Sequence, residues 1–398
     1  MVESKKENMK VLHFSHKPAF PLIDGGCIAI KSVLKSLMIH SDVEVVHFTL
    51  STQKHPFSLE AYPSNWRKVT PIYNCSIDTK TDIIGAAIHL LRNKSYNIER
   101  FHQKKVKKKL THLLEEHHFD LVILESIFLL PYVSLFQEND VKVFVRTHNV
   151  EYKIWEQLAK ETANPIKKWY LRRLSEQLKK EELEGLRKVD GIISISVDDT
   201  TYFQQNGYVL SKITTVETAV NYPEQPANVD KNDFYFLGAM DWKPNIEGIH
   251  WLLKEVFPHT AFPKPFHLAG KALKKGQLQH EGLVCHGEIP DALSFIQDHG
   301  ICVIPLLSGS GIKIKLLENM ALGKPIVTTT EGARGIAVAH GTHVLVADSP
   351  REFKAAMLKL MNDKILRKDI GFAAYQFVIN NFDENILTNR LVEFIAQK

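Results

Sequence analysis

Lys313 and Lys315 are the residues of this sequence whose positions most clearly suggest chemistry. They follow an apolar run over residues 301–306, which is typical of a strand buried in a parallel sheet, and a turn in which Gly309 and Gly311 let the backbone approach a ligand closely. The helix expected after this turn carries both lysines in its first turn, where the helix dipole disfavours cations unless an anion is also present. The arrangement therefore indicates a phosphate.

Glu318 lies three residues after Lys315, on the same face of a helix expected from Ile312 to Gly323. A carboxylate at this place can accept two hydrogen bonds from a vicinal diol such as a ribose. Phosphate at the start of the helix and ribose one turn later would describe a bound nucleotide. The other interpretation is an ordinary ion pair on a solvated helix face, which stabilises a helix by only ~0.2–0.5 kcal/mol.

The segment from Gly309 to Val327 resembles the donor-site segment of glycosyltransferase family 4, the retaining GT-B enzymes, in its subfamily with a Gly-Ser-Gly loop. Residues 236–248, residues 147–152 and the Asp-Gly-Gly turn at Asp24 resemble the same family in the same order. The likeness extends over nearly the whole chain, although the N-terminal half matches only at these short places.

The resemblance implies an α/β protein with the GT-B fold, in which two Rossmann-like domains have parallel sheets that face each other across a cleft. It also implies a retaining glycosyltransferase of the hexosyltransferase type, which moves a sugar from a UDP or GDP sugar to a hydroxyl of a carbohydrate or lipid-linked acceptor. Cell-surface polysaccharide or glycolipid biosynthesis is the expected setting. Two alternatives stay open: a GT-B nucleotide-sugar epimerase, and a protein that binds nucleotide sugar without turnover.

Strand and helix patterns alternate along the chain, which independently predicts parallel sheets with right-handed crossovers. A polar stretch with two prolines at residues 221–233 separates two such series. We expect an acceptor-side Rossmann-like domain over residues 1–220 and a nucleotide-sugar-binding Rossmann-like domain over residues 221–380. Residues 351–380 look helical, and the resemblance implies that residues 381–398 form a helix that packs back on the N-terminal domain.

Residues that directly follow strands are the natural ligand contacts, because open parallel sheets bind ligands beyond the carboxyl ends of their strands. His148 and Asn149 follow one expected strand, and Gly25 and Gly26 follow the first. By resemblance, His148 hydrogen-bonds the donor sugar and Asn149 shapes the acceptor side. The glycine pair would approach the donor phosphates or the sugar. The other interpretations are a structural histidine and a tight turn between a strand and a helix.

Three positions depart from the family pattern or match it weakly. Lys243 follows a strand, but Ala239 occupies the place of the usual family arginine, so Lys243 is only a weak phosphate ligand. Ser310 occupies the place of the first of two family glutamates. We expect its hydroxyl and the glycine amides beside it to replace that glutamate, and impaired catalysis is the alternative. Ile289 lies where family backbone groups contact the nucleobase.

No metal ion or cofactor is expected, since the nucleotide sugar is itself the substrate. No Asp-x-Asp motif suited to a metal-bound diphosphate stands at the end of an expected strand. Lys315, helped by Lys313, and the helix amides would instead stabilise the charge of the leaving diphosphate. By resemblance, the acceptor hydroxyl attacks on the face that the diphosphate leaves, and a donor phosphate oxygen takes the proton.

Composition and charge limit the other function classes. The 398 residues have a net charge of +5 and four separated cysteines, so neither a disulfide framework nor a zinc-type cysteine pair is indicated. Without a signal-peptide core or an apolar run of ~18 residues, the protein is expected to be cytoplasmic. Basic residues 104–109 and 165–174, the second with Trp169, would suit peripheral contact with an anionic inner membrane face or would be solvated helix faces. No nucleic-acid-binding module accompanies them.

Overall fold

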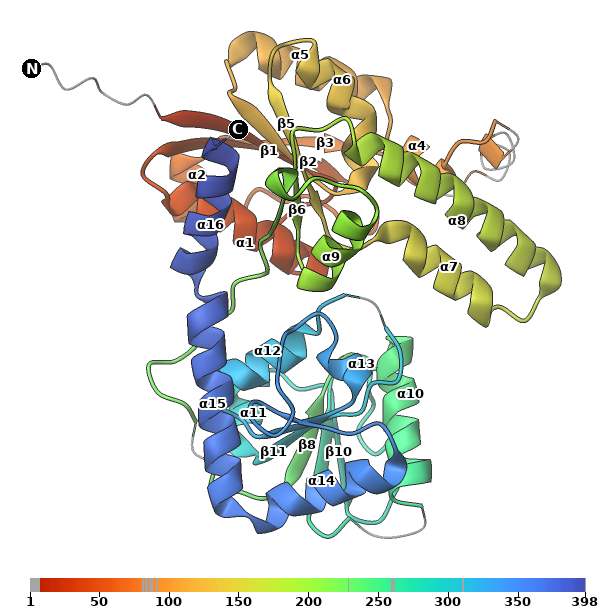
Figure 1. Cartoon of the computed structure of the whole chain (residues 1–398), viewed down its shortest axis with the longest axis vertical. Helices are drawn as coiled ribbons and strands as arrows, with labels where there is room; N and C mark the ends of the chain where they lie inside the picture. The colour runs from red at the N-terminus through yellow and green to blue at the C-terminus, as the bar shows by residue number, and fades with distance from the viewer. Residues whose placement is uncertain are drawn as a thin grey trace, which may run out of the picture. The chain divides into compact units, whose positions relative to one another are not determined.

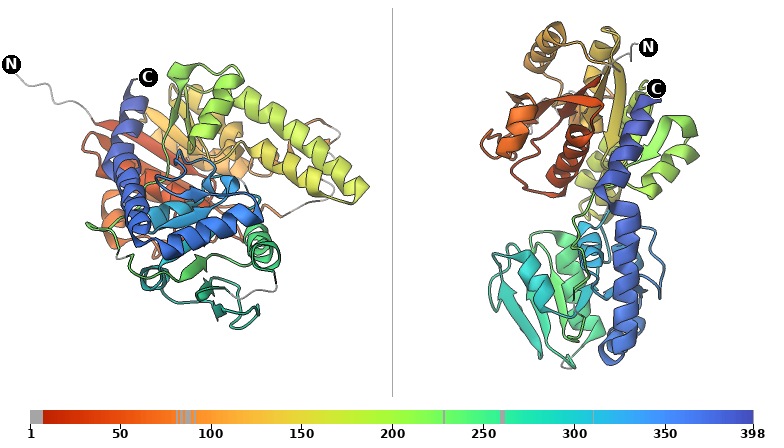
Figure 2. Two further views of the ribbon diagram at one scale, coloured as in Figure 1. Left: turned by 60° about the horizontal axis from the view of Figure 1, so that its bottom comes forward. Right: turned by 90° about the vertical axis from the view of Figure 1, so that its left-hand side faces the viewer.

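The computed structural model describes residues 8–80, 82, 85, 89–90, 92–227, 229–258, 262–309 and 311–397. The chain divides into two compact units, each built around a parallel sheet that helices cover (Figure 1, Figure 2). The N-terminal unit consists of Met1–Thr218 together with Leu387–Lys398, and the C-terminal unit consists of Ala219–Ile386.

The N-terminal unit contains a parallel sheet of seven strands in the order β3-β2-β1-β4-β5-β6-β7. The strands are β1 (Met9–Ser15), β2 (Val43–Ser51), β3 (Ile72–Ser76), β4 (Leu121–Glu125), β5 (Lys142–Thr147), β6 (Gly191–Ser194) and β7 (Ile213–Thr215). The middle strand β4 is buried at every residue, because helices cover both faces of a parallel sheet. The carboxyl ends of β1, β4 and β5 lie side by side, and the register places Ser15 and Arg146 next to Glu125.

Apolar residues at helical spacing and N-capping side chains explain where the helices of this unit form. In α5, Val106, Leu110 and Leu113 recur at helical spacing and are buried in the core, whereas the lysines between them are exposed. Asn164 caps α8 by accepting a hydrogen bond from the Lys167 amide. The helical segments are α1 (Gly25–Ile39), α2 (Ser64–Val69), α4 (Tyr96–Glu99), α5 (Lys104–Glu116), η1 (Ile127–Tyr132), α6 (Val133–Gln137), α7 (Glu151–Glu161), α8 (Pro165–Leu186), α9 (Val197–Gln205) and η2 (Leu210–Lys212).

The last helix, α16 (Glu384–Ala396), ends within the N-terminal unit. Its Phe394 ring packs edge-on against Phe144 with a centroid distance of 5.8 Å. Arg390 forms an ion pair with Glu217, with 2.9 Å between Nη1 and Oε2. The end of the chain is therefore fastened by both apolar and ionic contacts.

The C-terminal unit contains a six-stranded parallel sheet in the order β10-β9-β8-β11-β12-β13. The strands are β8 (Phe234–Leu237), β9 (Phe266–Ala269), β10 (Leu283–Gly287), β11 (Ile301–Ile304), β12 (Ile326–Thr328) and β13 (Leu345–Val346). Its helical segments are α10 (Lys243–Trp251), η3 (Leu252–Val256), α11 (Ala292–Asp298), α12 (Ile314–Ala321), α13 (Thr330–Ala333), α14 (Pro350–Asn362) and α15 (Lys364–Phe382).

Two helix predictions need correction. The single helix expected over residues 351–380 is broken at Asp363, which follows α14 and caps α15 by accepting a hydrogen bond from the Leu366 amide. The helix expected from Ile312 begins at Ile314 instead. Within the ranges that the structure describes, no helix combines the length and the apolar composition needed to cross a membrane.

Candidate active site

A glycine turn in the C-terminal unit connects β11 to α12. Gly309 has φ +123° and Gly311 has φ +71°, a backbone region that residues with a side chain rarely adopt. A Cβ on Gly309 would also lie 3.1 Å from the Trp242 ring. Glycine is therefore suited to this turn for two reasons: it adopts the positive φ angles, and it leaves room for the Trp242 ring beside Gly309. Ser310, the expected replacement for a family glutamate, lies outside the described residues.

Lys313 is buried and holds this turn from the inside. Its Nζ donates to the carbonyl oxygens of Gly309 at 3.1 Å and Gly311 at 2.9 Å, and lies 3.5 Å from Glu331 Oε1. These bonds keep Lys313 in a non-helical conformation just before α12, so the two lysines do not share the first helical turn as the sequence suggested. Burial lowers the pKa of Lys313, and Glu331 opposes that effect.

Lys315 lies in the first turn of α12, and its ammonium is fixed by three side chains. Its Nζ donates to Asn245 Oδ1 at 2.6 Å and lies 4.5 Å and 5.7 Å from the ring centroids of Phe236 and Trp242. Asn245 is oriented in turn by its Nδ2, which donates to the Ala239 carbonyl at 2.7 Å. Burial lowers the pKa of Lys315 to about 8, so the side chain is still mostly a cation at pH 7.

Glu318 lies one turn further along α12, and its side chain is exposed. Surrounding protein raises its pKa by desolvation, but the exposure lets water solvate the carboxylate. The helix thus presents a fixed cation at its start and an accessible acceptor one turn later. Gly309, Gly311, Lys313, Lys315 and Glu318 all lie on the turn and helix between β11 and β12, and the Lys313 ammonium is directed to carbonyl oxygens of the turn.

Lys243 and Ile289 are connected to this segment less directly. The Lys243 side chain is largely exposed and pairs with Glu247 at 3.2 Å, and Glu247 in turn accepts a hydrogen bond from Ser308 Oγ at 2.8 Å. Lys243 is thereby linked to the strand end before the glycine turn. Ile289 follows β10, is half-buried and packs against the apolar core of the unit.

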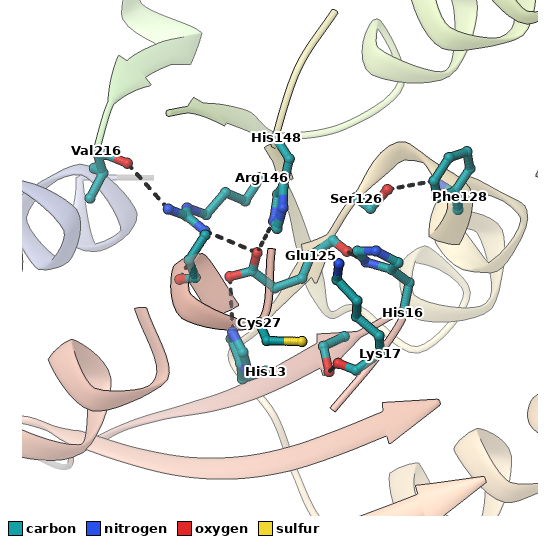
Figure 3. Close-up of polar contacts among 12 residues, drawn as sticks. His13, His16, Lys17, Cys27, Glu125, Ser126, Phe128, Arg146, His148 and Val216 are labelled. Atoms are coloured by element: carbon teal, nitrogen blue, oxygen red, sulfur yellow. Dashed lines mark hydrogen bonds and ion pairs between the residues drawn. The ribbon is translucent and has the colours of Figure 1, made fainter. Parts of the chain in front are cut away.

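A buried carboxylate, Glu125, is the centre of a polar network in the N-terminal unit (Figure 3). Its Oε1 accepts from His13 Nε2 at 3.0 Å, and its Oε2 accepts from His148 Nε2 at 2.7 Å and Arg146 Nη1 at 3.2 Å. Burial alone would raise the pKa of Glu125. The Arg146 charge and the hydrogen bonds from His13 and His148 outweigh burial, and hold the pKa well below the ordinary range.

Beyond His13, the network continues through two further buried side chains. His13 Nδ1 lies 3.0 Å from His47 Nδ1, and His47 Nε2 lies 3.3 Å from the Tyr62 hydroxyl. An unprotonated His13 Nε2 would face a carboxylate oxygen across 3.0 Å, so a neutral His13 carries its proton on Nε2. The Tyr62 hydroxyl then donates to His47 Nε2, and His47 Nδ1–H donates to His13 Nδ1. Burial keeps the pKa of His47 well below its usual value, which agrees with a neutral ring.

The same reasoning assigns the protons of His148. Its Nε2–H is donated to Glu125, and burial lowers its pKa although Glu125 opposes the shift, so the ring is neutral and Nδ1 is a hydrogen-bond acceptor. The His16 ring lies edge-on to it at 5.7 Å between centroids. His16 Nδ1 donates to the Glu125 backbone carbonyl at 2.6 Å, and burial followed by the Lys17 charge lowers the pKa of His16 to about 3.

The expected glycine pair begins α1, where Lys17 supplies a cation. Asp24 caps the helix by accepting from the Cys27 amide, and Lys17 Nζ contacts both Asp24 oxygens at 2.7 Å and 3.0 Å. A Cβ on Gly26 would lie only 2.4 Å from Lys17 Nζ, so Gly26 makes room for this ammonium. Gly25 is exposed at the first position of the helix, and Asn149 is half-buried after β5.

Glu125 and His13 are polar residues of the candidate site that the sequence reasoning missed. Glu125 ends a run of four apolar residues and His13 interrupts another, and both are fully buried. A charged side chain is almost never fully buried unless it is paired. Glu125 and His13, which stand at and within apolar runs, could therefore have been recognised from the sequence as a buried carboxylate and its possible partner. Asn245 follows the strand that ends near Gly238 and is therefore expected from the sequence near the ligand site, but its pairing with Lys315, 70 residues away along the chain, had no sequence signal.

Comparisons with known proteins concern the family and the fold of the chain. Residues 231–363, in the C-terminal unit, match the family model described as Glycosyl transferases group 1. A Klebsiella pneumoniae protein named "Uncharacterized 44.6 kDa protein in cps region" is 22% identical over 302 residues, which are 71% of this chain and 75% of that protein. An uncharacterized glycosyltransferase of Methanocaldococcus jannaschii is 30% identical over 105 residues, which are 26% of this chain and 30% of that protein.

Solved structures match over nearly the whole chain. HepE from Anabaena in complex with UDP has a TM-score of 0.68 and 13% identity, with 98% of this chain and 100% of that chain covered. Sucrose-phosphate synthase from Thermosynechococcus elongatus has a TM-score of 0.69 and 14% identity, with 98% and 99% covered. At such identities the likeness concerns the fold, which is the GT-B fold with two parallel-sheet α/β domains. The fold class expected from the sequence is thereby confirmed. Together with the family match, the fold supports a glycosyltransferase.

Proposed function

We propose that this protein is a retaining glycosyltransferase of family 4, which moves a hexose from a UDP or GDP sugar to a hydroxyl of a carbohydrate or lipid-linked acceptor. The observation that carries the proposal is the Lys315 ammonium, held at the start of α12 beside a glycine turn, with Glu318 exposed one turn later. The HepE structures contain UDP or UDP-glucose, which favours a UDP-type donor. The relative from a cps region favours a role in cell-surface polysaccharide or glycolipid biosynthesis.

In the proposed reaction, the Lys315 ammonium stabilises the leaving diphosphate. Negative charge grows on the diphosphate as the bond to the sugar breaks, and a cation that is already oriented needs little reorganisation to stabilise it. Asn245 and the rings of Phe236 and Trp242 supply that orientation for Lys315. Glu318 would accept hydrogen bonds from the ribose hydroxyls. Gly309, Ser310 and Gly311 would supply backbone and hydroxyl groups near the sugar.

In the N-terminal unit, we assign the donor-sugar contact to His148. Its neutral ring offers Nδ1 as an acceptor, so it would receive a hydrogen bond from a sugar hydroxyl. We place Gly25 and Gly26 near the donor phosphates or the sugar and Asn149 on the acceptor side, with the Ile289 backbone at the nucleobase. The acceptor hydroxyl would lose its proton to a donor phosphate oxygen. No metal ion or further cofactor takes part in this proposal.

A donor screen tests the proposal. Purified protein is mixed with UDP-, GDP- and ADP-hexoses, and the melting temperature is measured, since a ligand at 100 times its Kd adds about 2.7 kcal/mol of stability. Release of nucleoside diphosphate with candidate acceptors, and the anomeric configuration of the product by NMR, then test retaining transfer. Conversion of a donor without acceptor would identify an epimerase, and binding without turnover would identify a binding protein.

Peripheral contact with an anionic membrane is part of the proposal. At the start of α8, Ile166 and Trp169 are 79% and 61% exposed, beside the basic residues Lys167, Lys168 and Arg172. Exposed apolar side chains among cations suit an anionic lipid surface. Flotation with anionic vesicles should recover the wild-type protein and lose an Ile166→Ser/Trp169→Ser variant. Equal recovery of both would reject this contact surface.

A further inference from the structure

Three histidines gather in the C-terminal unit away from the glycine turn. His267 lies in β9, His286 in β10, and His299 follows α11 two residues before β11. Each offers a ring nitrogen, and the three nitrogens lie within 4.8 Å of one another. His299 and the neighbouring Asp233 are close to the amino ends of β11 and β8, whereas the glycine turn leaves the carboxyl end of β11. His299 and Asp233 therefore lie at the other end of β11 from the glycine turn.

The two nitrogens of the His267 ring face different partners. Nδ1 lies 2.9 Å from His286 Nε2, and Nε2 lies 3.6 Å from Asp233 Oδ2. The same Asp233 oxygen lies 2.7 Å from His299 Nδ1, and the other accepts from the Gly300 amide at 3.0 Å. The rings of His267 and His299 stack with centroids 4.0 Å apart. Asp233 thus accepts the Nδ1–H of His299, which leaves Nε2 of that ring with a lone pair.

Imidazole binds a metal ion through the lone pair of a ring nitrogen that carries no proton. His267 and His286 bring one such nitrogen to their 2.9 Å contact, and the contact of Asp233 with Nδ1 of His299 directs the lone pair of that ring to Nε2.

We propose that His267, His286 and His299 bind one divalent first-row transition-metal ion of the Zn²⁺ type, with Asp233 orienting His299. Imidazole ligands suit zinc, and a carboxylate behind a ligating histidine fixes its tautomer in many zinc sites. Tetrahedral ligands at ~2.0–2.1 Å lie about 3.4 Å apart and direct their lone pairs at one point, so the nearly parallel rings of His267 and His299 need to turn toward the ion as well as to shift by roughly an ångström. The ion would bind between His267 Nδ1 and His286 Nε2, and the proton that these two nitrogens share would move to the other nitrogen of its ring. The ion would tie the edge strand β10 to β9 and to the segment before β11.

A second group of possible metal ligands, Asp24, Cys27 and His55 in the N-terminal unit, is unsuited to a metal ion. Lys17 Nζ contacts both oxygens of Asp24, so an ammonium already neutralises that carboxylate. His55 Nε2 also lies 2.9 Å from Asp24 and shares the same oxygen. A metal ion would have to displace the lysine, whereas the histidine cluster contains no ammonium among its ligands.

Titration calorimetry with ZnCl₂ on the full chain, depleted of metal with EDTA and desalted, tests the site. We expect saturable binding of one ion per chain and a higher melting temperature with zinc. His286→Ala should abolish this binding, whereas the control His250→Ala, an exposed histidine of α10, should leave it unchanged. Asp233→Asn should weaken it by about 10–100-fold, because the orienting carboxylate is lost.

The shape of the far-UV circular dichroism spectrum shows whether each variant is folded. If His286→Ala does not fold, Asp233→Asn and His286→Gln provide the same comparison. Absence of saturable zinc binding to the wild-type chain would overturn the proposal. Binding that persists undiminished in folded His286 and Asp233 variants would overturn it as well, because such binding would belong to surface histidines.

Discussion

His148 Nε2 and Glu125 Oε2 lie 2.7 Å apart at the carboxyl ends of two neighbouring strands, β5 and β4. This contact fixes the tautomer of His148, because the proton on Nε2 is committed to a buried anion. The nitrogen that remains, Nδ1, can accept a hydrogen bond but cannot donate one while the ring is neutral. A strand-end histidine is thereby turned into an oriented acceptor for a hydroxyl group.

Replacement of His148 by alanine tests whether this residue contacts the sugar and not the nucleoside diphosphate. We expect the affinity for free nucleoside diphosphate to stay almost unchanged and kcat/KM for sugar transfer to fall by about tenfold, since one neutral hydrogen bond contributes ~0.5–1.5 kcal/mol. Melting temperature, diphosphate affinity and transfer rate are measured on the same variant. A full rate with intact folding would remove His148 from the site, and a parallel loss of all three would make it a structural residue.

Replacement of Glu125 by glutamine should destabilise the protein. The change leaves the buried Arg146 without its counter-charge, and breaking a buried ion pair from one side costs about 3–5 kcal/mol. Glu44→Gln is the matched control, because it breaks the exposed pair with Lys10, which is worth about 0–1 kcal/mol. Urea unfolding of the three proteins is the measurement. Equal midpoints for both variants would show that the Glu125–Arg146 pair does not hold the unit together.

The buried histidines predict a loss of stability in mild acid. An unfolded chain protonates its histidines as the pH falls through about 6.5, whereas folded His16 takes up its proton only near pH 3 and folded His47 well below 6.5. Their contribution is thus complete above pH 6.5 and is lost between pH 6.5 and the folded pKa values, by about 1.4 kcal/mol per pH unit for each ring. His16→Asn should flatten the fall in melting temperature from pH 6.5 to 4.5. An equally steep fall in this variant would contradict the assignment.

Much of the C-terminal half of the candidate site could be predicted from the sequence. The glycine turn, the apolar strand before it and the spacing of Lys315 and Glu318 are all local patterns, and local patterns determine helix and strand type well. The start of α12 was misplaced because Lys313 bonds to carbonyl oxygens of the turn two and four residues before it, a short-range contact between side chain and backbone that competes with the helical conformation. The break at Asp363 had a local signal, since aspartate is a preferred N-cap.

The N-terminal network could not be assembled from the sequence. His13, Glu125 and His148 come from three strands spread over more than a hundred residues, and only the order β1-β4-β5 in the sheet makes them neighbours. A period of two or of 3.6 residues identifies a strand or a helix but carries no information on strand order. The partners of a buried charge therefore had to come from the folded structure.

Removal of divalent metal should not slow sugar transfer. Lys315 and the amides of α12 supply the positive field in the proposed mechanism, so Mg²⁺ or Mn²⁺ added to EDTA-treated protein should leave the rate unchanged. Zinc is added back separately, because a zinc ion at His267, His286 and His299 would affect stability and not the chemical step. A rate that EDTA abolishes and Mg²⁺ or Mn²⁺ restores would overturn metal-independent transfer.

Capture of the nucleoside diphosphate by Lys315 and Glu318 is most directly tested by calorimetric titration with UDP and GDP. The wild-type chain should bind one of them. Glu318→Ala should weaken that binding by about 1.5–3 kcal/mol, the range for a hydrogen bond to a charged group, and Lys315→Ala should weaken it at least as much. Lys359→Ala, an exposed lysine of α14, should bind like wild type. Unchanged affinity in folded Lys315 and Glu318 variants would contradict the proposed donor site.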